Sequence, residues 1–255
     1  MNRVIVITGA SSGIGAALAE LLGKNGARLA LIARREPELR AVAARSGPDA
    51  LAISADVTRR ADVARAADEC LQKYGRVDVW INNAGRGISR SVLDLTDEDL
   101  DQMTSVNVKS ALYGMQIAVP IFRQQGGGHL INVSSVLGRV PLAPFRSAYS
   151  ASKHALNALT ACLRLDLRSE PSIVVSSVHP GVVATEFGSR ALHGGPDSRA
   201  LPGSQTPEEV AQVIAELIEH PRADVYTRPQ AKDLVLGYYG AEDMGQAERK
   251  PPFFS

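Results

Sequence analysis

The sequence has few cysteines and almost no net charge. Its two cysteines, Cys70 and Cys162, stand far apart and belong to no CxxC motif or Cys/His cluster. This spacing argues against a disulfide framework and against a zinc site, and both cysteines are predicted to be reduced. The formal net charge of +1 provides no field that would attract nucleic acid or an anionic membrane. We therefore expect no metal, no nucleic-acid partner and no membrane partner.

Long hydrophobic runs are also missing. No apolar segment reaches the roughly 18 residues that a membrane span needs. The first residues lack the apolar stretch and small-residue cleavage site of a secretory signal. The hydrophobic fraction of 45% and the charged fraction of 22% are typical of a globular protein, and 255 residues are enough to bury a core. The simplest prediction is one cytoplasmic domain spanning residues 1–255.

Apolar strands alternate with amphipathic helices along most of the chain. This alternation predicts right-handed βαβ units, and hence an α/β Rossmann fold with a doubly wound parallel sheet of about seven strands flanked by helices. The predicted strands are 3–8, 27–33, 50–54, 77–82, 129–134, 173–179 and a short one near 225–226. The predicted helices are 14–25, 36–45, 60–74, 97–125, 149–169 and 208–220, with Thr96 as a helix cap and Pro120 as a possible kink.

Two regions depart from this rhythm. Residues 186–205 are rich in Gly, Pro, Ser and Arg and show no period, which predicts a substrate lid or a disordered loop. The tail, residues 241–255, ends in Phe253 and Phe254 before the last serine. These two rings are expected either to dock on the domain or a partner subunit, or to belong to a loose tail.

A glycine-rich turn follows the first strand and leads into a helix. Glycines let a backbone approach a ligand closely, and a helix N-terminus presents unpaired N–H groups and a positive dipole end. The turn therefore predicts a site for the pyrophosphate of a dinucleotide, although its spacing differs from the common dinucleotide fingerprint. Its residues are Gly9, Ser11, Ser12, Gly13, Ile14 and Gly15.

The end of the second strand indicates which dinucleotide is bound. A carboxylate there would bond the ribose 2′-hydroxyl of NAD. This chain instead has Arg34 and Arg35, whose guanidinium groups suit a 2′-phosphate. The alternative is that both are solvated arginines at a helix start. We therefore predict NADP(H) in preference to NAD(H).

Tyr149 and Lys153 stand four positions apart, so both lie on one face of the predicted helix. A phenol can donate or accept a proton, and a neighbouring ammonium favours the phenolate. Such a pair is also common on solvated helix faces. The pair alone therefore does not distinguish a proton-transfer site from two solvated side chains. Its interpretation depends on the rest of the chain.

The chain as a whole resembles the short-chain dehydrogenase/reductase family, from Val4 to about Tyr226. The matching features occur in the family's order and with nearly its spacing, which makes them specific together although none is specific alone. They are Thr8-Gly9-x3-Gly13-x-Gly15, Asp56-Val57, Asn82-Asn83-Ala84-Gly85, Asn107, Ser135, Tyr149-x3-Lys153, and Pro180-Gly181 with Thr185.

The resemblance implies a role for each catalytic candidate. Tyr149 would donate a proton to a carbonyl under reduction, or remove one from an alcohol. Lys153 would lower the pKa of Tyr149 and bond the nicotinamide ribose. Ser135, rather than Ser134, would hold the substrate oxygen, and Asn107 would anchor a water that links Lys153 to solvent.

The resemblance also implies the remaining cofactor contacts. Asp56 and Val57 would contact the adenine, Asn83 and Ala84 the adenosine-side ribose, and Val182 and Thr185 the nicotinamide amide. Gly85, Pro180 and Gly181 complete the predicted cofactor set. One departure concerns the substrate side, because Ser135 precedes Tyr149 by one residue more than in many members. A one-residue insertion in a loop is easily absorbed.

The substrate is the least defined part of the prediction. The expected wall comprises residues 87–93, 136–145 and 186–201. Its first two segments contribute a mostly apolar set, which predicts a hydrophobic ketone or aldehyde. This set is Ile88, Val92, Val136, Leu137, Val140, Leu142 and Phe145. The loop arginines are expected to be solvated or to meet an acidic substrate, which keeps an acyl-thioester open. They are Arg90, Arg139, Arg146 and Arg190.

Two other function classes fit the same motifs. One is a non-redox, epimerase-type enzyme, which would keep its cofactor without net consumption. The other is an NADP-sensing binding module, in which the catalytic residues would normally have decayed; their presence argues against it. The resemblance further implies that the helices 97–125 and 149–169 pack with those of other copies into a homodimer or homotetramer.

Overall fold

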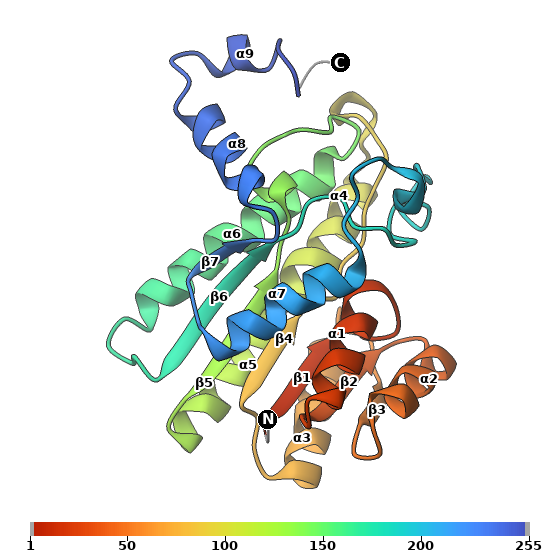
Figure 1. Cartoon of the computed structure of the whole chain (residues 1–255), viewed down its shortest axis with the longest axis vertical. Helices are drawn as coiled ribbons and strands as arrows, with labels where there is room; N and C mark the ends of the chain where they lie inside the picture. Colours follow the sequence, from red (N-terminus) through yellow and green to blue (C-terminus); the bar gives the residue numbers. More distant parts are fainter. Residues whose placement is uncertain (1–2, 253–255) are drawn as a thin grey trace.

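The computed structural model describes residues 3–252, so Phe253 and Phe254, on which the tail prediction rests, lie outside the described residues. Within residues 3–252, seven parallel strands form one sheet in the order β3-β2-β1-β4-β5-β6-β7 (Figure 1). This confirms the predicted fold. The strands are β1 (Val4–Thr8), β2 (Arg28–Ala33), β3 (Leu51–Ser54), β4 (Val79–Asn82), β5 (Gly128–Val133), β6 (Ile173–His179) and β7 (Asp224–Tyr226).

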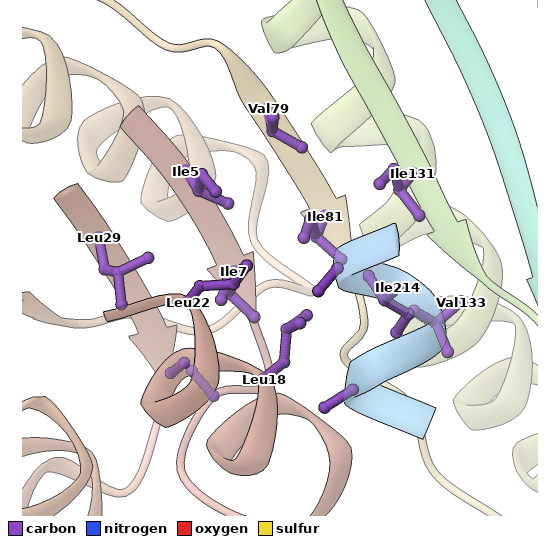
Figure 2. Packing of buried hydrophobic residues seen from close by; sticks show 14 of the residues in the cluster. Ile5, Ile7, Leu18, Leu22, Leu29, Val79, Ile81, Ile131, Val133 and Ile214 are labelled. Atoms are coloured by element: carbon purple, nitrogen blue, oxygen red, sulfur yellow. The ribbon is translucent and has the colours of Figure 1, made fainter. Parts of the chain in front are cut away.

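Helices cover both faces of the sheet. The helices α1 (Gly13–Lys24), α2 (Glu36–Ser46) and α7 (Pro207–Glu219) pack on one face, and α3 (Arg60–Tyr74), α5 (Ser110–Gln125) and α6 (Ser147–Asp166) pack on the other. Successive strand residues point to opposite faces, so Ile5 and Ile7 join the first core and Val4 and Val6 the second. Figure 2 shows Leu18 and Ile214 meeting the first core. Apolar runs on the strands are thus buried on both sides.

The order of the strands reverses between β1 and β4. From β1 the chain moves outward through β2 and β3, then returns to place β4 on the other side of β1. Ligands of open α/β sheets bind where such a reversal separates the loops at the carboxyl ends of the strands. The turn after β1 and the segment after β4 therefore flank the expected crevice.

The single helix predicted for residues 97–125 is wrong in detail. It consists of α4 (Asp97–Thr104), a π-helical turn η2 (Ser105–Lys109) and α5. The capping box of Thr96 and Asp99 is present as a start signal, and Pro120 lies inside α5. Asn107 lies within the π turn and is held by partners outside the helix. The hydrophobic pattern of a sequence predicts which face of a helix is buried. It does not predict a π-helical turn whose side chain bonds residues distant in sequence.

The C-terminal part adds two helices that the sequence pattern did not predict, α8 (Pro229–Tyr239) and α9 (Met244–Ala247). Figure 1 shows both in dark blue, beyond the end of the sheet. Val235 and Tyr238 of α8 pack with Val136 and Val140. The short helices η1 (Val92–Asp94), η3 (Val136–Gly138) and η4 (Ser198–Ala200) lie in loops, and η4 belongs to the expected lid. Across residues 3–252, no helix combines the length and apolarity required to cross a membrane.

Candidate active site

Glycines shape the turn between β1 and α1. A larger residue at these positions would strain the backbone or force neighbouring atoms to move. Gly9 and Gly13 adopt left-handed backbone conformations, with φ of 68° and 56°. A Cβ added at Gly15 would lie 2.4 Å from the Gly9 carbonyl oxygen. Ser12 is the N-cap of α1 and makes no side-chain capping bond. The result is a close backbone cradle at a helix N-terminus, which fits the pyrophosphate of a dinucleotide.

Thr8 ties the turn to the end of β4. It belongs to the glycine-rich motif, but the sequence analysis did not predict it as a site residue. The backbone N–H groups of Asn83 and Ala84 donate to Thr8 Oγ1 at 3.0 and 3.1 Å. The Asn83 amide in turn donates to the Thr8 carbonyl at 2.9 Å. The contact of Asn83 with the adenosine-side ribose stays a prediction, and the structure shows that its amide nitrogen holds the turn. It therefore contributes to the shape of the crevice.

The two arginines after β2 differ in their surroundings. Arg34 is exposed. Arg35 reaches back across the turn, and its Nη2 donates to Ser11 Oγ at 3.0 Å and to Ser12 Oγ at 2.7 Å. The guanidinium of Arg35 is therefore held beside the phosphate turn, where a 2′-phosphate would require a cation.

The remaining predicted cofactor residues line the same edge of the sheet. Asp56 accepts hydrogen bonds from the backbone and the hydroxyl of Thr58, and Val57 packs against the second core. On the other side, a Cβ at Gly13 would lie 3.2 Å from Thr185 Cγ2. Residues 180–185 thus approach the phosphate turn, with Gly181 and Val182 exposed and Pro180 buried at the end of β6.

Tyr149, Ser135 and Lys153 come together between β5 and α6. All three are buried, with Tyr149 8%, Ser135 7% and Lys153 3% exposed. Lys153 Nζ lies 5.7 Å from the centroid of the Tyr149 ring and donates to the Val133 carbonyl at 2.9 Å. Ser135 caps η3 by accepting from the Leu137 N–H at 3.1 Å. The extra residue between Ser135 and Tyr149 therefore leaves the three side chains in one group.

Burial dominates the acidity of this group. It raises the pKa of Tyr149 to about 12, while hydrogen bonding by Ser135 and the charge of Arg146 act to lower it. Burial also lowers the pKa of Lys153 to about 8. The action of Lys153 on the pKa of Tyr149, which the resemblance implies, stays a prediction.

Asn107 lies next to this group and is 1% exposed. Its amide accepts from the Arg86 N–H at 2.9 Å and donates to the Arg86 carbonyl at 2.9 Å and to Ser152 Oγ at 3.0 Å. A Cβ at Gly85 would lie 3.2 Å from Asn107 Oδ1 and 3.6 Å from Lys153 Nζ. A side chain at position 85 would therefore contact both Asn107 and Lys153. Ser152, which sequence reasoning missed, stands between Tyr149 and Lys153 in the chain.

The predicted substrate wall is only partly correct. Ile88 clusters with Tyr149, and Leu137, Phe187 and Leu192 pack against that cluster. The Phe187 ring meets the Tyr149 ring edge-on, with centroids 5.5 Å apart. Three residues expected in the wall face α8 instead, because its apolar side chains cover that side of the loop; they are Val136, Val140 and Leu142. Val92 and Phe145 are exposed.

The four loop arginines are also arranged differently from the prediction. Three of them pair with carboxylates: Arg90 with Asp99, Arg139 with Asp224 and Arg190 with Glu186. Arg146 is 8% exposed and donates to the Ile88 carbonyl at 3.1 Å. Among residues 3–252, no group of three or more His, Cys, Asp or Glu side chains is arranged to hold a metal ion.

Comparisons with known proteins agree with this geometry. A family model described as short chain dehydrogenase matches residues 3–194. The chain is 35% identical over 243 residues to Uncharacterized oxidoreductase YxnA of Bacillus subtilis (strain 168), covering 92% of this chain and 68% of that protein.

Two solved structures are similar over most of the chain. One is a short chain dehydrogenase/reductase from Burkholderia phymatum in complex with NAD, with a TM-score of 0.87, 28% identity, and coverage of 98% of this chain and 96% of that chain. The other is an alcohol dehydrogenase from the archaeon Thermococcus sibiricus complexed with 5-hydroxy-NADP, with a TM-score of 0.76, 28% identity, and coverage of 88% and 95%.

Proposed function

Because the chain belongs to the short-chain dehydrogenase family, we propose that this oxidoreductase uses NADP(H) to interconvert a ketone or aldehyde and the corresponding alcohol. One observation carries the proposal: the phenol of Tyr149 is buried beside Ser135 and Lys153. The group follows β5, and β5 pairs with β4, the strand at which the order of the sheet reverses. This position supports Tyr149 as a proton donor next to the expected nicotinamide end of the cofactor.

Each residue of the group has a chemical task in this proposal. The bound cofactor supplies the hydride that reduces the carbonyl carbon. Tyr149 donates its proton to the carbonyl oxygen as that oxygen gains the electron pair of the C=O bond, and Ser135 holds the same oxygen by hydrogen bonding. Lys153 binds the nicotinamide ribose. In the reverse direction, the Tyr149 phenolate accepts the alcohol proton.

Proton supply to Tyr149 is assigned to the side of the site that faces Asn107. The Asn107 amide is fixed by the backbone of Arg86 and by Ser152, and a Cβ at Gly85 would lie close to both Asn107 and Lys153. We place a water in this relay, linking Lys153 to solvent. A Gly85→Ala substitution would put a methyl group at the position of that Cβ.

A nicotinamide cofactor is supported by the solved relatives, which carry NAD in one case and an NADP derivative in the other. The preference for NADP(H) rests on Arg35, whose guanidinium is fixed beside Ser11 and Ser12. The two residues that directly follow β2 are arginines, so the carboxylate that would bond a ribose 2′-hydroxyl at this strand end is missing. Isothermal titration with NADPH and NADH tests the preference, and equal affinities would show it to be wrong.

The substrate is proposed to be a hydrophobic ketone or aldehyde. Ile88, Leu137, Phe187 and Leu192 surround Tyr149 with apolar surface. Three of the four loop arginines are already paired with carboxylates of the protein, which leaves less positive charge for an acidic substrate than the sequence indicated.

The test is a screen of NADPH oxidation against aliphatic and aromatic ketones, aldehydes, acyl-thioesters and small polar sugars. We expect loss of NADPH absorbance with hydrophobic carbonyls. Turnover of polar sugars alone would contradict the substrate assignment. Product formation without net NADPH consumption would instead indicate an epimerase-type reaction.

Tyr149→Phe provides the matched test of the proton donor. The variant keeps the ring that packs on Phe187 and removes only the hydroxyl. We expect turnover to fall by about a thousandfold, with NADPH affinity unchanged within about twofold. An unchanged rate would refute the assigned role.

Assembly into a homodimer or homotetramer is also proposed. Leu100 of α4 and Leu165 of α6 are exposed, at 47% and 63%, on the helices that the family resemblance assigns to subunit contacts. Sedimentation equilibrium distinguishes the monomer from either assembly.

A further inference from the structure

The loop after β4 and the expected lid are joined by backbone hydrogen bonds. The N–H of Leu192 donates to the Gly87 carbonyl at 2.9 Å, and the N–H of Ser89 donates to the Leu192 carbonyl at 2.9 Å. These bonds form an isolated parallel bridge between Ile88 and Leu192. Ile88 belongs to the apolar cluster that contains Tyr149, and Leu192 packs against this cluster. The bridge therefore fixes a lid side chain in the expected substrate wall.

His193, the next residue of the lid, has a left-handed backbone conformation. Its φ is 60°, and among residues 3–252 it is the one non-glycine residue with a positive φ. A residue with a side chain adopts this conformation rarely, and the conformation persists where surrounding contacts hold it. A Cβ added at Gly195 would lie 2.7 Å from Ser89 Oγ, so the lid stays close to the loop just after His193. We therefore examined which contacts hold His193.

The side chain of His193 contacts both α4 and the loop after β4. Its Nε2 lies 2.7 Å from Asp99 Oδ1, and its Nδ1 lies 3.3 Å from Arg90 Nη2. Arg90 Nη1 in turn donates to Asp99 Oδ2 at 2.9 Å. One tautomer of the ring satisfies both partners, because Nε2–H donates to the carboxylate while Nδ1 accepts from the guanidinium. These three side chains, the His193 clasp, connect three segments of the chain.

Asp99 is a firmly held partner for the lid. It is 4% exposed, and it forms the capping box of α4, in which its Oδ2 accepts from the Thr96 N–H at 3.2 Å. The hydrogen bond from His193 lowers the pKa of Asp99 to about 2, so the carboxylate is charged and its bonds are charge-assisted. Met103, one turn further along α4, belongs to the cluster that contains Tyr149. The face of α4 that holds the lid is therefore also the face that packs in this cluster.

We propose that the His193 clasp determines how much space a substrate has next to Tyr149, because it holds Leu192 of the lid against Ile88. The inference rests on the proposed function, which supplies the hydrophobic carbonyl that this space would accept. The three side chains of the clasp are positioning residues, since they act through Leu192 and take no part in bond making. Loss of the clasp should let the lid move away from Ile88 and weaken substrate binding without altering the proton transfer.

Amide hydrogen exchange, followed by NMR, measures lid opening without any substrate. The N–H groups of Leu192 and Ser89 report on the bridge, because both lose their acceptors when the lid leaves the loop. Two other N–H groups form backbone bonds at the base of the lid, that of Ala184 to the Gln205 carbonyl and that of Gln205 to the Val182 carbonyl. They serve as internal references, since the base of the lid should stay closed.

His193→Asn breaks the clasp with little change to the backbone. Asn tolerates the left-handed conformation, but its side chain is too short to replace the ring Nε2. We expect exchange at Leu192 and Ser89 to become about tenfold faster, with the reference amides unchanged within about twofold. Arg199→Gln is the matched control and should leave this exchange unchanged, because Arg199 pairs with Asp197 of the lid itself. Unchanged exchange in His193→Asn, or equal acceleration at all four amides, would overturn the proposal.

A double-mutant cycle with Asp99→Asn separates the clasp from the helix cap. This substitution keeps a side-chain oxygen for the Thr96 N–H and removes the charge that His193 and Arg90 bond. If His193 and Asp99 act as one contact, the double variant should exchange no faster than the faster single variant. Accelerations that multiply would mean that the two residues act independently, which contradicts the clasp. Arg90→Gln replaces Asp99→Asn in the cycle if the latter does not fold.

Steady-state kinetics connect the clasp to the substrate. With a hydrophobic carbonyl found in the screen, His193→Asn should raise KM about fivefold, while kcat and NADPH affinity stay within about twofold. An unchanged KM together with faster exchange would refute the link to the substrate wall. If the screen finds no substrate, the proposed function fails, and the exchange measurements still decide whether the clasp holds the lid.

Discussion

The proposed cofactor side and the proposed substrate side of this site are built in different ways. The cofactor side consists mainly of residues 3–85, where the turns directly follow β1, β2, β3 and β4 and are fixed by glycines and strand ends, and residues 180–185 approach it after β6. The substrate side consists of residues 87–93, 136–145 and 186–201 together with α8, which meet only through long-range contacts. Local sequence therefore determines the first side, and tertiary packing determines the second.

This difference predicts separable defects. A substitution on the cofactor side should change the affinity for NADPH, and one on the substrate side should change the KM of the carbonyl at constant cofactor affinity. Tyr149 and Lys153 stand where the two sides meet. A variant that violates this separation would show that the two sides are coupled.

The largest effect is expected for Gly15→Ala. The added methyl group would lie 2.4 Å from the Gly9 carbonyl oxygen and 2.7 Å from Asn83 Nδ2, so the phosphate turn must widen. We expect NADPH affinity to fall about a hundredfold, because backbone N–H groups lose their position on the pyrophosphate. Fluorescence titration with NADPH measures the loss.

Gly237→Ala is the control for this substitution. Gly237 lies in α8, has an ordinary φ and has open space where a Cβ would stand. Its NADPH affinity should match that of the unmodified protein. Equal affinities for the Gly15 and Gly237 variants would contradict the assignment of the turn as the phosphate site.

A smaller effect on the same side is expected for Arg35→Gln. Removing the guanidinium beside Ser11 and Ser12 should lower NADPH affinity about tenfold, since a charge-assisted bond to the 2′-phosphate is lost. NADH affinity should be unchanged, because NADH lacks this phosphate. Arg34→Gln serves as the comparison, and its effect should be smaller because Arg34 is exposed.

Isothermal titration with both cofactors distinguishes two roles of Arg35. A loss confined to NADPH supports phosphate recognition. An equal loss for both cofactors would mean that Arg35 only supports the turn through its bonds to the two serines.

Lys153→Met tests how much the buried charge of Lys153, which lies where the two sides meet, lowers the free energy of unfolding. Burial lowers the pKa of Lys153 to about 8 from its ordinary 10.5, so the folded protein binds the lysine proton less tightly than the unfolded chain. The destabilisation caused by the charged lysine is therefore at its maximum below pH 8, and it disappears as the pH rises toward 10.5. Removing the charge should stabilise the protein at neutral pH while turnover is lost.

The expected gain is about 1–2 kcal/mol, because the unpaired Val133 carbonyl offsets part of the desolvation relieved. Urea unfolding at several pH values measures it, and the gain should shrink above pH 8. Lys73→Met, an exposed lysine of α3, should show no such dependence. A Lys153 variant that is less stable at every pH would contradict the argument.

The same contrast explains how much of the fold and of the candidate site could be predicted from the sequence. The seven strands and the phosphate turn follow from apolar runs, glycines and strand ends, so they could be predicted. The π turn at Asn107 could not, because it depends on Arg86 and Ser152, which are distant in sequence. The sequence predicts Arg146 only as an arginine in a loop. Its burial depends on the segments around Gly87 and Gly195, which approach its guanidinium and are distant in sequence. Likewise, Val136 and Val140 were expected in the substrate wall, but α8 covers them.

The smallest expected effect tests whether α8 supports the substrate side. Tyr239 of α8 donates its hydroxyl to the Arg139 carbonyl at 2.8 Å, which ties the C-terminal helix to the loop that follows Ser135. Tyr239→Phe removes one exposed hydrogen bond, so the loop should lose about 0.5–1 kcal/mol of support. We expect the KM of the carbonyl to rise about threefold, with kcat and NADPH affinity unchanged. Tyr238→Phe is the matched control, because that hydroxyl donates to Glu248 rather than to the loop. A fall in NADPH affinity in the Tyr239 variant would break the separation, since support from α8 would then reach the cofactor side as well.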